Sequence, residues 1–142
     1  MTLLLFIHLL AIGIWAGCVA TEAVCEIGQK DVPFKKSYIA PLHWNIDKFV
    51  EIPAIIIAAI SGFIMLENAP SDPILSFKII AGIAAVCLNT LASFLVYKRL
   101  KCYQADDEEG YLKYNLLHDR IGVGCVLSIS AAIALGGYYL VV

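Results

Sequence analysis

Four uninterrupted apolar stretches constrain this chain more than any other feature of its sequence. They cover roughly residues 3–21, 49–66, 74–96 and 121–142. Each is close to the ~20 residues that an α-helix needs to cross a hydrocarbon layer ~30 Å thick. A helix on the surface of a soluble protein would carry a polar stripe at every third or fourth residue, and these stretches lack one. The sequence therefore predicts an all-α integral membrane protein with four spanning helices.

The overall composition agrees with this prediction. Hydrophobic residues make up 61% of the 142 residues and charged residues only 15%, whereas soluble domains are nearer ~50% and ~25%. The turn ENAPSDP (67–73) is short, so the second and third helices must be antiparallel neighbours. We therefore expect a single domain, an up-down-up-down four-helix bundle. Its helices should cover about residues 2–26, 42–66, 73–100 and 115–141.

The basic residues predict how the bundle is oriented in its membrane. Nine of the ten Lys and Arg residues lie in or beside the first and third connections, and only Lys78 lies on the other side. Cytoplasmic loops are enriched in Lys and Arg, so we expect both connections in the cytoplasm and both termini outside, in a bacterial-type inner membrane. The nine residues are Lys30, Lys35, Lys36, Lys48, Lys98, Arg99, Lys101, Lys113 and Arg120.

The charge pattern also bears on partners. Acidic side chains of DDEE (106–109) are interleaved with the basic residues and the net charge is −2, so nucleic acid binding is not expected. The apolar surface makes the lipid bilayer a partner, and the sequence leaves a redox partner and a homo-oligomer open. It contains no Gly-x-Ser-x-Gly nucleophile motif and no phosphate-binding glycine loop, so no catalytic residue is assigned.

Ionisable residues occur where the second helix begins. In HWNIDKFVE (43–51), His43, Asp47 and Glu51 recur at every fourth residue. This spacing places the three side chains on one face of a helix. Ionisable groups inside a membrane are costly unless they are paired or wet, and each is therefore a candidate for function.

Further ionisable residues fall at two depths of the predicted bundle. Near the cytoplasmic side, Glu22 ends the first helix and His118 begins the fourth, at about the depth of His43. Near the other side, His8 and Lys78 lie at similar depths in the first and third helices. The two layers are too far apart for one cofactor to use all three histidines, because the helix rise separates them axially by over ~20 Å.

Three short stretches resemble parts of known membrane proteins. HLLAIGIWAG (8–17) resembles the His-x6-Trp-x-Gly first helix of copper-resistance D (CopD) type proteins and of HemJ-type protoporphyrinogen oxidases. PAIIIAAISG (53–62) and FKIIAG (77–82) are similar to the second and third helices of HemJ-type proteins. The resemblance implies a divergent membrane haem protein in which His8 is a ligand of haem b and Lys78 assists at the same site.

The first functional hypothesis is therefore a membrane-embedded b-type haem protein with an electron-transfer or oxidoreductase role. Side chains on facing helices of a four-helix bundle can supply both axial ligands. His43 and His118 are the best pair of imidazoles by depth and by their diagonal placement. His8, with Lys78 nearby, is the candidate for a second or alternative haem.

The alternative hypothesis is a transition-metal site at the cytoplasmic ends of the first, second and fourth helices. Two imidazoles and several carboxylates suit zinc, iron(II) or manganese. In this hypothesis Asp47 or Glu26 is an outer partner of the ligands. The candidate residues are Glu22, His43, Asp47, Glu51 and His118.

A third hypothesis is a structural or assembly subunit of a membrane complex. In that case the acids and histidines only form ion pairs at the helix ends, with Lys48 and Arg120 as the nearest cations in the sequence. Such pairs in wet headgroup regions contribute little to stability.

Overall fold

The computed structural model describes residues 3–67 and 69–141, which form helices joined by short turns. Four of the helical segments are long and apolar enough to cross a membrane, as predicted. The elements are α1 (Leu3–Gln29), η1 (Phe34–Lys36), α2 (Ile39–Ile46), η2 (Asp47–Glu51), α3 (Ile52–Leu66), α4 (Pro73–Gln104) and α5 (Glu108–Val141). The segments α2, η2 and α3 follow one another without a break and make a single span.

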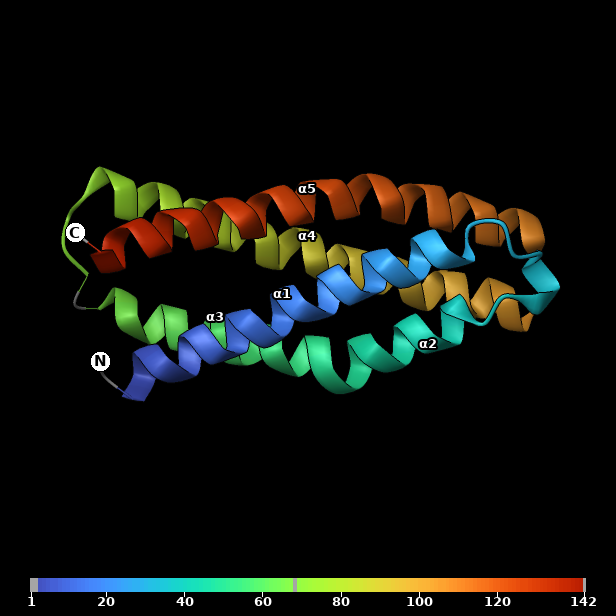
Figure 1. Cartoon of the computed structure of the whole chain (residues 1–142), viewed down its shortest axis with the longest axis horizontal. Helices are drawn as coiled ribbons and strands as arrows, with labels where there is room; N and C mark the ends of the chain where they lie inside the picture. The colour runs from blue at the N-terminus through green and yellow to red at the C-terminus, as the bar shows by residue number, and fades with distance from the viewer. Residues whose placement is uncertain (1–2, 68, 142) are drawn as a thin grey trace.

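Successive spans run in opposite directions, and both ends of the described chain lie at one end of the molecule (Figure 1). The span α4 packs along α5, and α1 packs along α3, and these are the two most extensive helix contacts in the described part of the chain. The arrangement is compatible with a four-helix bundle assembled from two helix pairs.

The centre of the bundle is built mainly from small side chains. Ala85 is fully buried, and large apolar side chains such as Phe63 and Leu127 are 72% and 66% exposed. Small residues allow helices to approach closely, and exposed apolar residues suit contact with lipid. The central cluster consists of Ala11, Trp15, Ala54, Ile55, Ala58, Ala85, Cys125 and Ile129.

All four helices extend further than the predicted bounds, and the second begins at Ile39 instead of position 42. The first reaches Gln29 and the third reaches Gln104, while the fourth begins at Glu108, seven residues before the predicted position 115. The carboxylate of Asp107 accepts a hydrogen bond from the Gly110 backbone N–H (2.9 Å), which satisfies a free amide of the first turn of α5. Hydropathy could not reveal these polar turns, because it detects only the apolar part of a helix.

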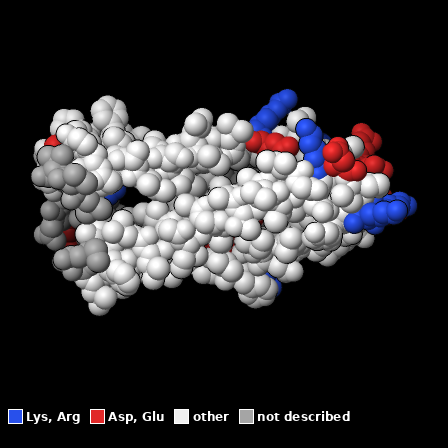
Figure 2. All heavy atoms as spheres, viewed as in Figure 1, with Lys and Arg blue, Asp and Glu red and all other residues white. Residues whose placement is uncertain are grey.

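Most of the charged side chains visible in Figure 2 gather at the end of the molecule opposite the termini. The rings of Phe34, Tyr103 and Tyr111 meet edge to face there, with centroids 5.6 Å and 5.0 Å from Phe34. An exposed ion pair between Lys35 and Asp106 (3.1 Å) also links the first and third connections. The two connections therefore pack together at the end of the bundle that contains the predicted polar layer.

Candidate functional site

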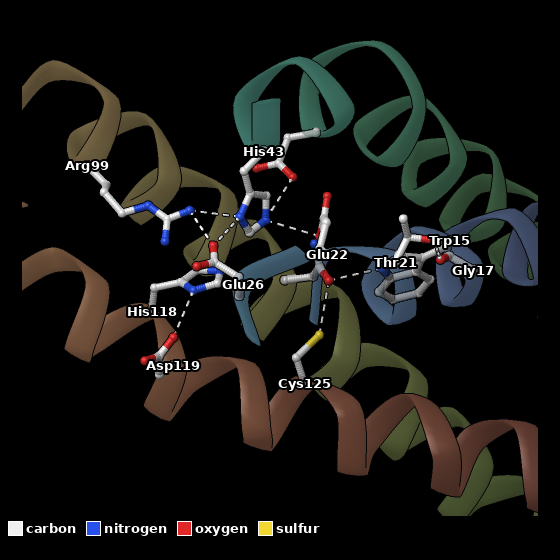
Figure 3. A network of polar contacts seen from close by, with 12 residues as sticks. Trp15, Gly17, Thr21, Glu22, Glu26, His43, Arg99, His118, Asp119 and Cys125 are labelled. Carbon is white, nitrogen blue, oxygen red and sulfur yellow. Dashed lines mark hydrogen bonds and ion pairs between the residues drawn. The ribbon is translucent and has the colours of Figure 1, made fainter. Parts of the chain in front are cut away.

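Ionisable side chains from all four spans converge inside the bundle near its charged end (Figure 3). The side chain of Arg99 is 0% exposed and that of Glu26, the most exposed of the set, is 20% exposed. The group is therefore shielded from solvent. It consists of Glu22 and Glu26 from α1, His43 from α2, Asp47 and Glu51 from η2, Arg99 from α4 and His118 from α5.

The imidazole of His43 is surrounded by carboxylates. Its Nε2 lies 3.1 Å from Oε2 of Glu22 and 3.6 Å from Oδ1 of Asp47. Its Nδ1 lies 2.9 Å from Oε1 of Glu26. Both ring nitrogens thus face acidic oxygens, and the His43 side chain is only 3% exposed.

Arg99 holds one of these carboxylates in place. Its guanidinium donates from Nη2 to Oε1 of Glu26 (2.6 Å) and from Nη1 to Oδ1 of Asn115 (2.5 Å). Nη2 also lies 2.8 Å from Nδ1 of His43, a contact that is a hydrogen bond only when that nitrogen carries no proton. When Nδ1 is protonated, it donates to Glu26 instead. Arg99 therefore positions Glu26 beside His43.

The wide turn η2 brings the three residues of the predicted face into the interior. The Ile52 backbone N–H donates to the Asp47 carbonyl, the i→i+5 bond of a π-helix. In an α-helix, a step of four residues overshoots a full turn by about 40°. A π turn holds more than four residues, so this overshoot disappears between Asp47 and Glu51. As a result His43, Asp47 and Glu51 are all buried, at 3%, 1% and 2% exposure.

Several carboxylate oxygens of the site are buried without a hydrogen-bond partner among the described residues. They are Oε1 of Glu22 and both side-chain oxygens of Asp47. Most buried polar atoms in proteins are hydrogen-bonded, so such atoms call for an explanation. One ligand atom from each of Glu22, His43 and Asp47 lies within 4.8 Å of the others. A single metal ion could reach all three after small side-chain rotations.

These three residues differ in part from the predicted ligand set. Asp47, which the sequence suggested as an outer partner, belongs to the closest group together with Glu22 and His43. Glu51 lies one turn further along the same span and is also buried. His118 contacts the ring of His43 edge to face, with centroids 5.0 Å apart and planes at 87°.

The contact between His43 and His118 bears on the haem hypothesis. Two imidazoles that ligate one haem iron must have the macrocycle between them. Rings in direct edge-to-face contact leave no room for it, so a haem at this position would require the helices to move apart. Haem ligation by this pair stays a prediction that needs such a rearrangement.

His8 and Lys78 lie in the other polar layer. Nδ1 of His8 lies 3.0 Å from the Ala58 carbonyl oxygen and 3.0 Å from Oγ of Ser61, which itself donates to the Ile57 carbonyl. Because a carbonyl only accepts, Nδ1 is the protonated nitrogen in this arrangement and Nε2 carries the lone pair. The stem of Lys78 packs beside Gly136 of α5.

Close packing against His8 predicts the effect of a small substitution. A Cβ atom added at Gly62 would lie 3.0 Å from Cε1 of His8, whereas one added at Gly82 would meet nothing within 4 Å. We expect Gly62→Ala to lower the free energy of unfolding by about 1–2 kcal/mol relative to Gly82→Ala, because overpacking outweighs the gain in helix propensity. Unfolding by SDS in mixed micelles would measure the difference. Equal stability of the two variants would contradict tight packing around His8.

Sequence reasoning missed two parts of the site. It assigned Arg99 only to the set of orienting cations, and it named Lys48 and Arg120 as partners for the acids. In the structure, Arg99 pairs with Glu26, whereas Lys48 lies over the ring of Phe49 (4.9 Å) and Arg120 is exposed. Among the described residues, neither Lys48 nor Arg120 forms the ion pair with a helix-end acid that the third hypothesis considered.

The second missed part is a group of hydrogen bonds around the buried Asn89, which lies next to the carboxylates on the side away from the charged end. The indole Nε1 of Trp15 donates to Oδ1 of Asn89 (3.0 Å), and the thiol of Cys125 donates to the same oxygen (3.0 Å). Asn89, Ala92, Ser93 and Val96 are all buried on α4. These residues recur at helical spacing, and Arg99 continues the same series. The inward face of α4, including Arg99, could have been predicted from this pattern.

The site opens into a cavity of about 860 Å³. Glu22, His43 and Asp47 line it on one side, and residues of α5 as far as Leu127 line it on the other. The residues of the first connection line one end. The cavity thus lies between α1 and α5, and residues of α4 such as Asn89 and Ser93 also line it.

No family model, no curated protein and no solved structure matches this chain. The comparisons do not link it to HemJ-type or CopD-type proteins, so that resemblance stays a prediction. The site is a buried group of carboxylates around one histidine, in a protein with four helices long and apolar enough to cross a membrane.

Proposed function

We propose that this membrane protein binds a divalent transition metal ion, of the zinc, iron(II) or manganese class, through Glu22, His43 and Asp47. The observation that supports this most is the set of buried carboxylate oxygens beside Nε2 of His43 that have no hydrogen-bond partner in the described part of the chain. A metal ion would satisfy these oxygens. A ligand set of imidazole and carboxylates binds such ions in preference to copper(I).

The surroundings of His43 support its role as a ligand. Metal-bound histidines usually donate their other ring N–H to a carboxylate or a carbonyl, which fixes the orientation of the ring. Here Nδ1 faces Glu26, and Arg99 holds Glu26 through a 2.6 Å contact. Nε2 is thereby left pointing toward Glu22 and Asp47.

The charge balance of the site points the same way. The buried group holds four carboxyl side chains, and Arg99 is its only residue that is always cationic. Unbalanced charge inside a membrane protein is costly. A divalent cation would compensate the excess of negative charge while His43 stays neutral.

We propose that the site lies at the cytoplasmic side of the membrane. The basic residues of the two connections support this orientation through the positive-inside rule. Metal would then reach the site from the cytoplasm, through the end of the cavity that the first connection lines.

A metal titration of the chelator-treated protein in detergent would test the proposal. We expect one Zn²⁺ or Mn²⁺ per chain, with binding that Glu22→Gln or His43→Ala abolishes and that Glu109→Gln leaves unchanged. Glu109 is a suitable control because it is an exposed acid on α5 that lies outside the cavity lining. Stoichiometric binding that survives both ligand substitutions would contradict the assignment.

The pH dependence of the affinity is a further prediction. Protonated imidazole cannot coordinate a metal, so a proton and the metal ion compete for His43. Affinity should therefore be highest at pH 8 and fall as the pH is lowered, by up to about tenfold per pH unit for each displaced proton. Isothermal titration calorimetry between pH 8 and pH 5 would measure this. An affinity that is flat across the range would argue against histidine ligation.

Haem b at His8 is a second proposal. The hydrogen bond from Nδ1 to the Ala58 carbonyl favours it, because it leaves Nε2 available as an axial ligand. The absorbance spectrum of the purified protein would test it. A Soret band that His8→Ala removes and His43→Ala retains is the expected result, and a colourless protein would contradict the proposal.

A further inference from the structure

The cavity beside the metal site has an apolar rim. Ile27 of α1 and Val123 and Leu127 of α5 line it and are themselves 75%, 63% and 66% exposed. In a membrane-spanning helix, exposed apolar side chains of this kind face the hydrocarbon of the bilayer. The gap between α1 and α5 therefore opens sideways toward lipid.

The floor of the same cavity is polar. Glu22, His43 and Asp47 line it, and Asp47 is 1% exposed with both carboxylate oxygens lacking a hydrogen-bond partner among the described residues. A space of about 860 Å³ falls within the ~300–1,000 Å³ typical of ligand pockets. The cavity is apolar toward the lipid and polar toward the interior. It therefore matches an amphiphilic molecule, with the apolar chain at the rim and the polar head group at the floor.

The metal site offers one further binding position. Three protein ligands leave a tetrahedral ion with one open position, as in catalytic zinc sites. All three ligands belong to α1 and the span α2–η2–α3, whereas the facing wall of the cavity is formed by α5. The open position would thus face the cavity.

We propose that the cavity takes a single-chain amphiphile from the bilayer. Its head group carries oxygen donors that coordinate the metal, and its apolar chain lies between α1 and α5. This inference rests on the proposed metal site and adds to it the chemical class of the ligand and its route of access.

Gly122 provides a way to close the cavity without touching the metal ligands. It lines the cavity, and a Cβ atom added there would meet nothing within 4 Å. The side chain of Gly122→Phe would occupy the space intended for the apolar chain. Gly82→Phe is the matched control, because Gly82 has equally open surroundings on α4 and does not line the cavity.

The experiment uses the full chain in lipid nanodiscs, loaded with Co²⁺, whose visible spectrum reports its ligands. Octanohydroxamic acid serves as the probe because it joins a bidentate oxygen head group to an apolar chain, and acetohydroxamic acid is its short-chain counterpart. We expect octanohydroxamic acid to change the cobalt spectrum at a concentration at least about tenfold lower than acetohydroxamic acid, consistent with burial of several methylene groups. Gly122→Phe should remove this advantage, and Gly82→Phe should retain it.

The outcomes separate this inference from the metal assignment. Failure of the wild-type protein to bind Co²⁺ would overturn both. Binding of Co²⁺ with a spectrum that octanohydroxamic acid leaves unchanged would overturn only the amphiphile proposal. An advantage of the long chain that persists in Gly122→Phe would show that partition into the lipid causes it, and this too would overturn the proposal.

Discussion

Replacing Arg99 by methionine is expected to lower the free energy of unfolding by about 3–5 kcal/mol, the range seen when one partner of a buried ion pair is removed. Arg99 is 0% exposed and donates to both Glu26 and Asn115. Methionine fills similar volume, so the loss would come from leaving the Glu26 carboxylate without its cation. Unfolding by SDS in mixed micelles would measure it.

Two further variants make the prediction on Arg99 specific. Lys101→Met removes an exposed cation from the same helix, close to Tyr97, and should change stability by less than about 1 kcal/mol. The double variant Arg99→Met with Glu26→Gln should be more stable than the sum of the two single effects by about 0.5–3 kcal/mol, because the two residues are in contact. Additive effects would indicate that the pair contributes no coupling energy.

Asp47→Asn should have opposite effects on metal binding and on stability. We expect metal affinity to fall by at least about 100-fold, more than the 10–100-fold typical for loss of an outer partner of a ligand. We also expect the metal-free protein to become as stable as the wild type or more stable. The amide has the same shape as the carboxylate, and it removes one negative charge from an excess that no described cation balances.

Glu51→Gln is the matched control for Asp47→Asn. Glu51 is also buried in η2, and the substitution makes the same change in charge, but it lies outside the closest ligand group. Its effect on metal affinity should stay within the ~10–100-fold range that is typical for loss of an outer partner of a ligand. Calorimetric titration with Zn²⁺, combined with unfolding of the metal-free forms, would measure all of these effects. A purely structural role of Asp47 would instead appear as lost stability of the metal-free Asp47→Asn variant with no specific loss of affinity.

The spans could be predicted from the sequence because their cause is local. A helix that must satisfy its backbone within a membrane needs about 20 apolar residues in a row, and the four apolar stretches provide them. The spacing of His43, Asp47 and Glu51 likewise indicated a shared face, and the structure places all three in the interior.

The partners of these residues were harder to predict. Glu26 and Arg99 are 73 residues apart, and nothing in the periodicity of either helix indicates which faces meet. Basic residues near a helix end also have a simpler explanation in the positive-inside rule, which hid the buried role of Arg99. The grouping of Asp47 with Glu22 depends on the rotation of η2, which a regular helical wheel does not include.

The wide turn at Asp47–Glu51 sets how the two halves of this span are rotated relative to each other. Because the turn holds an extra residue, the parts of the span before and after it are rotated relative to each other by an amount that a regular helix would not allow. If the same residues formed a regular α-helix instead, the preceding segment would be rotated by about 100° relative to the apolar half. His43 is thereby decoupled from the register of Ala54 and Ala58, which pack in the core. The turn therefore sets the rotation between the two halves, so that the His43 segment can face the polar site while Ala54 and Ala58 face the core.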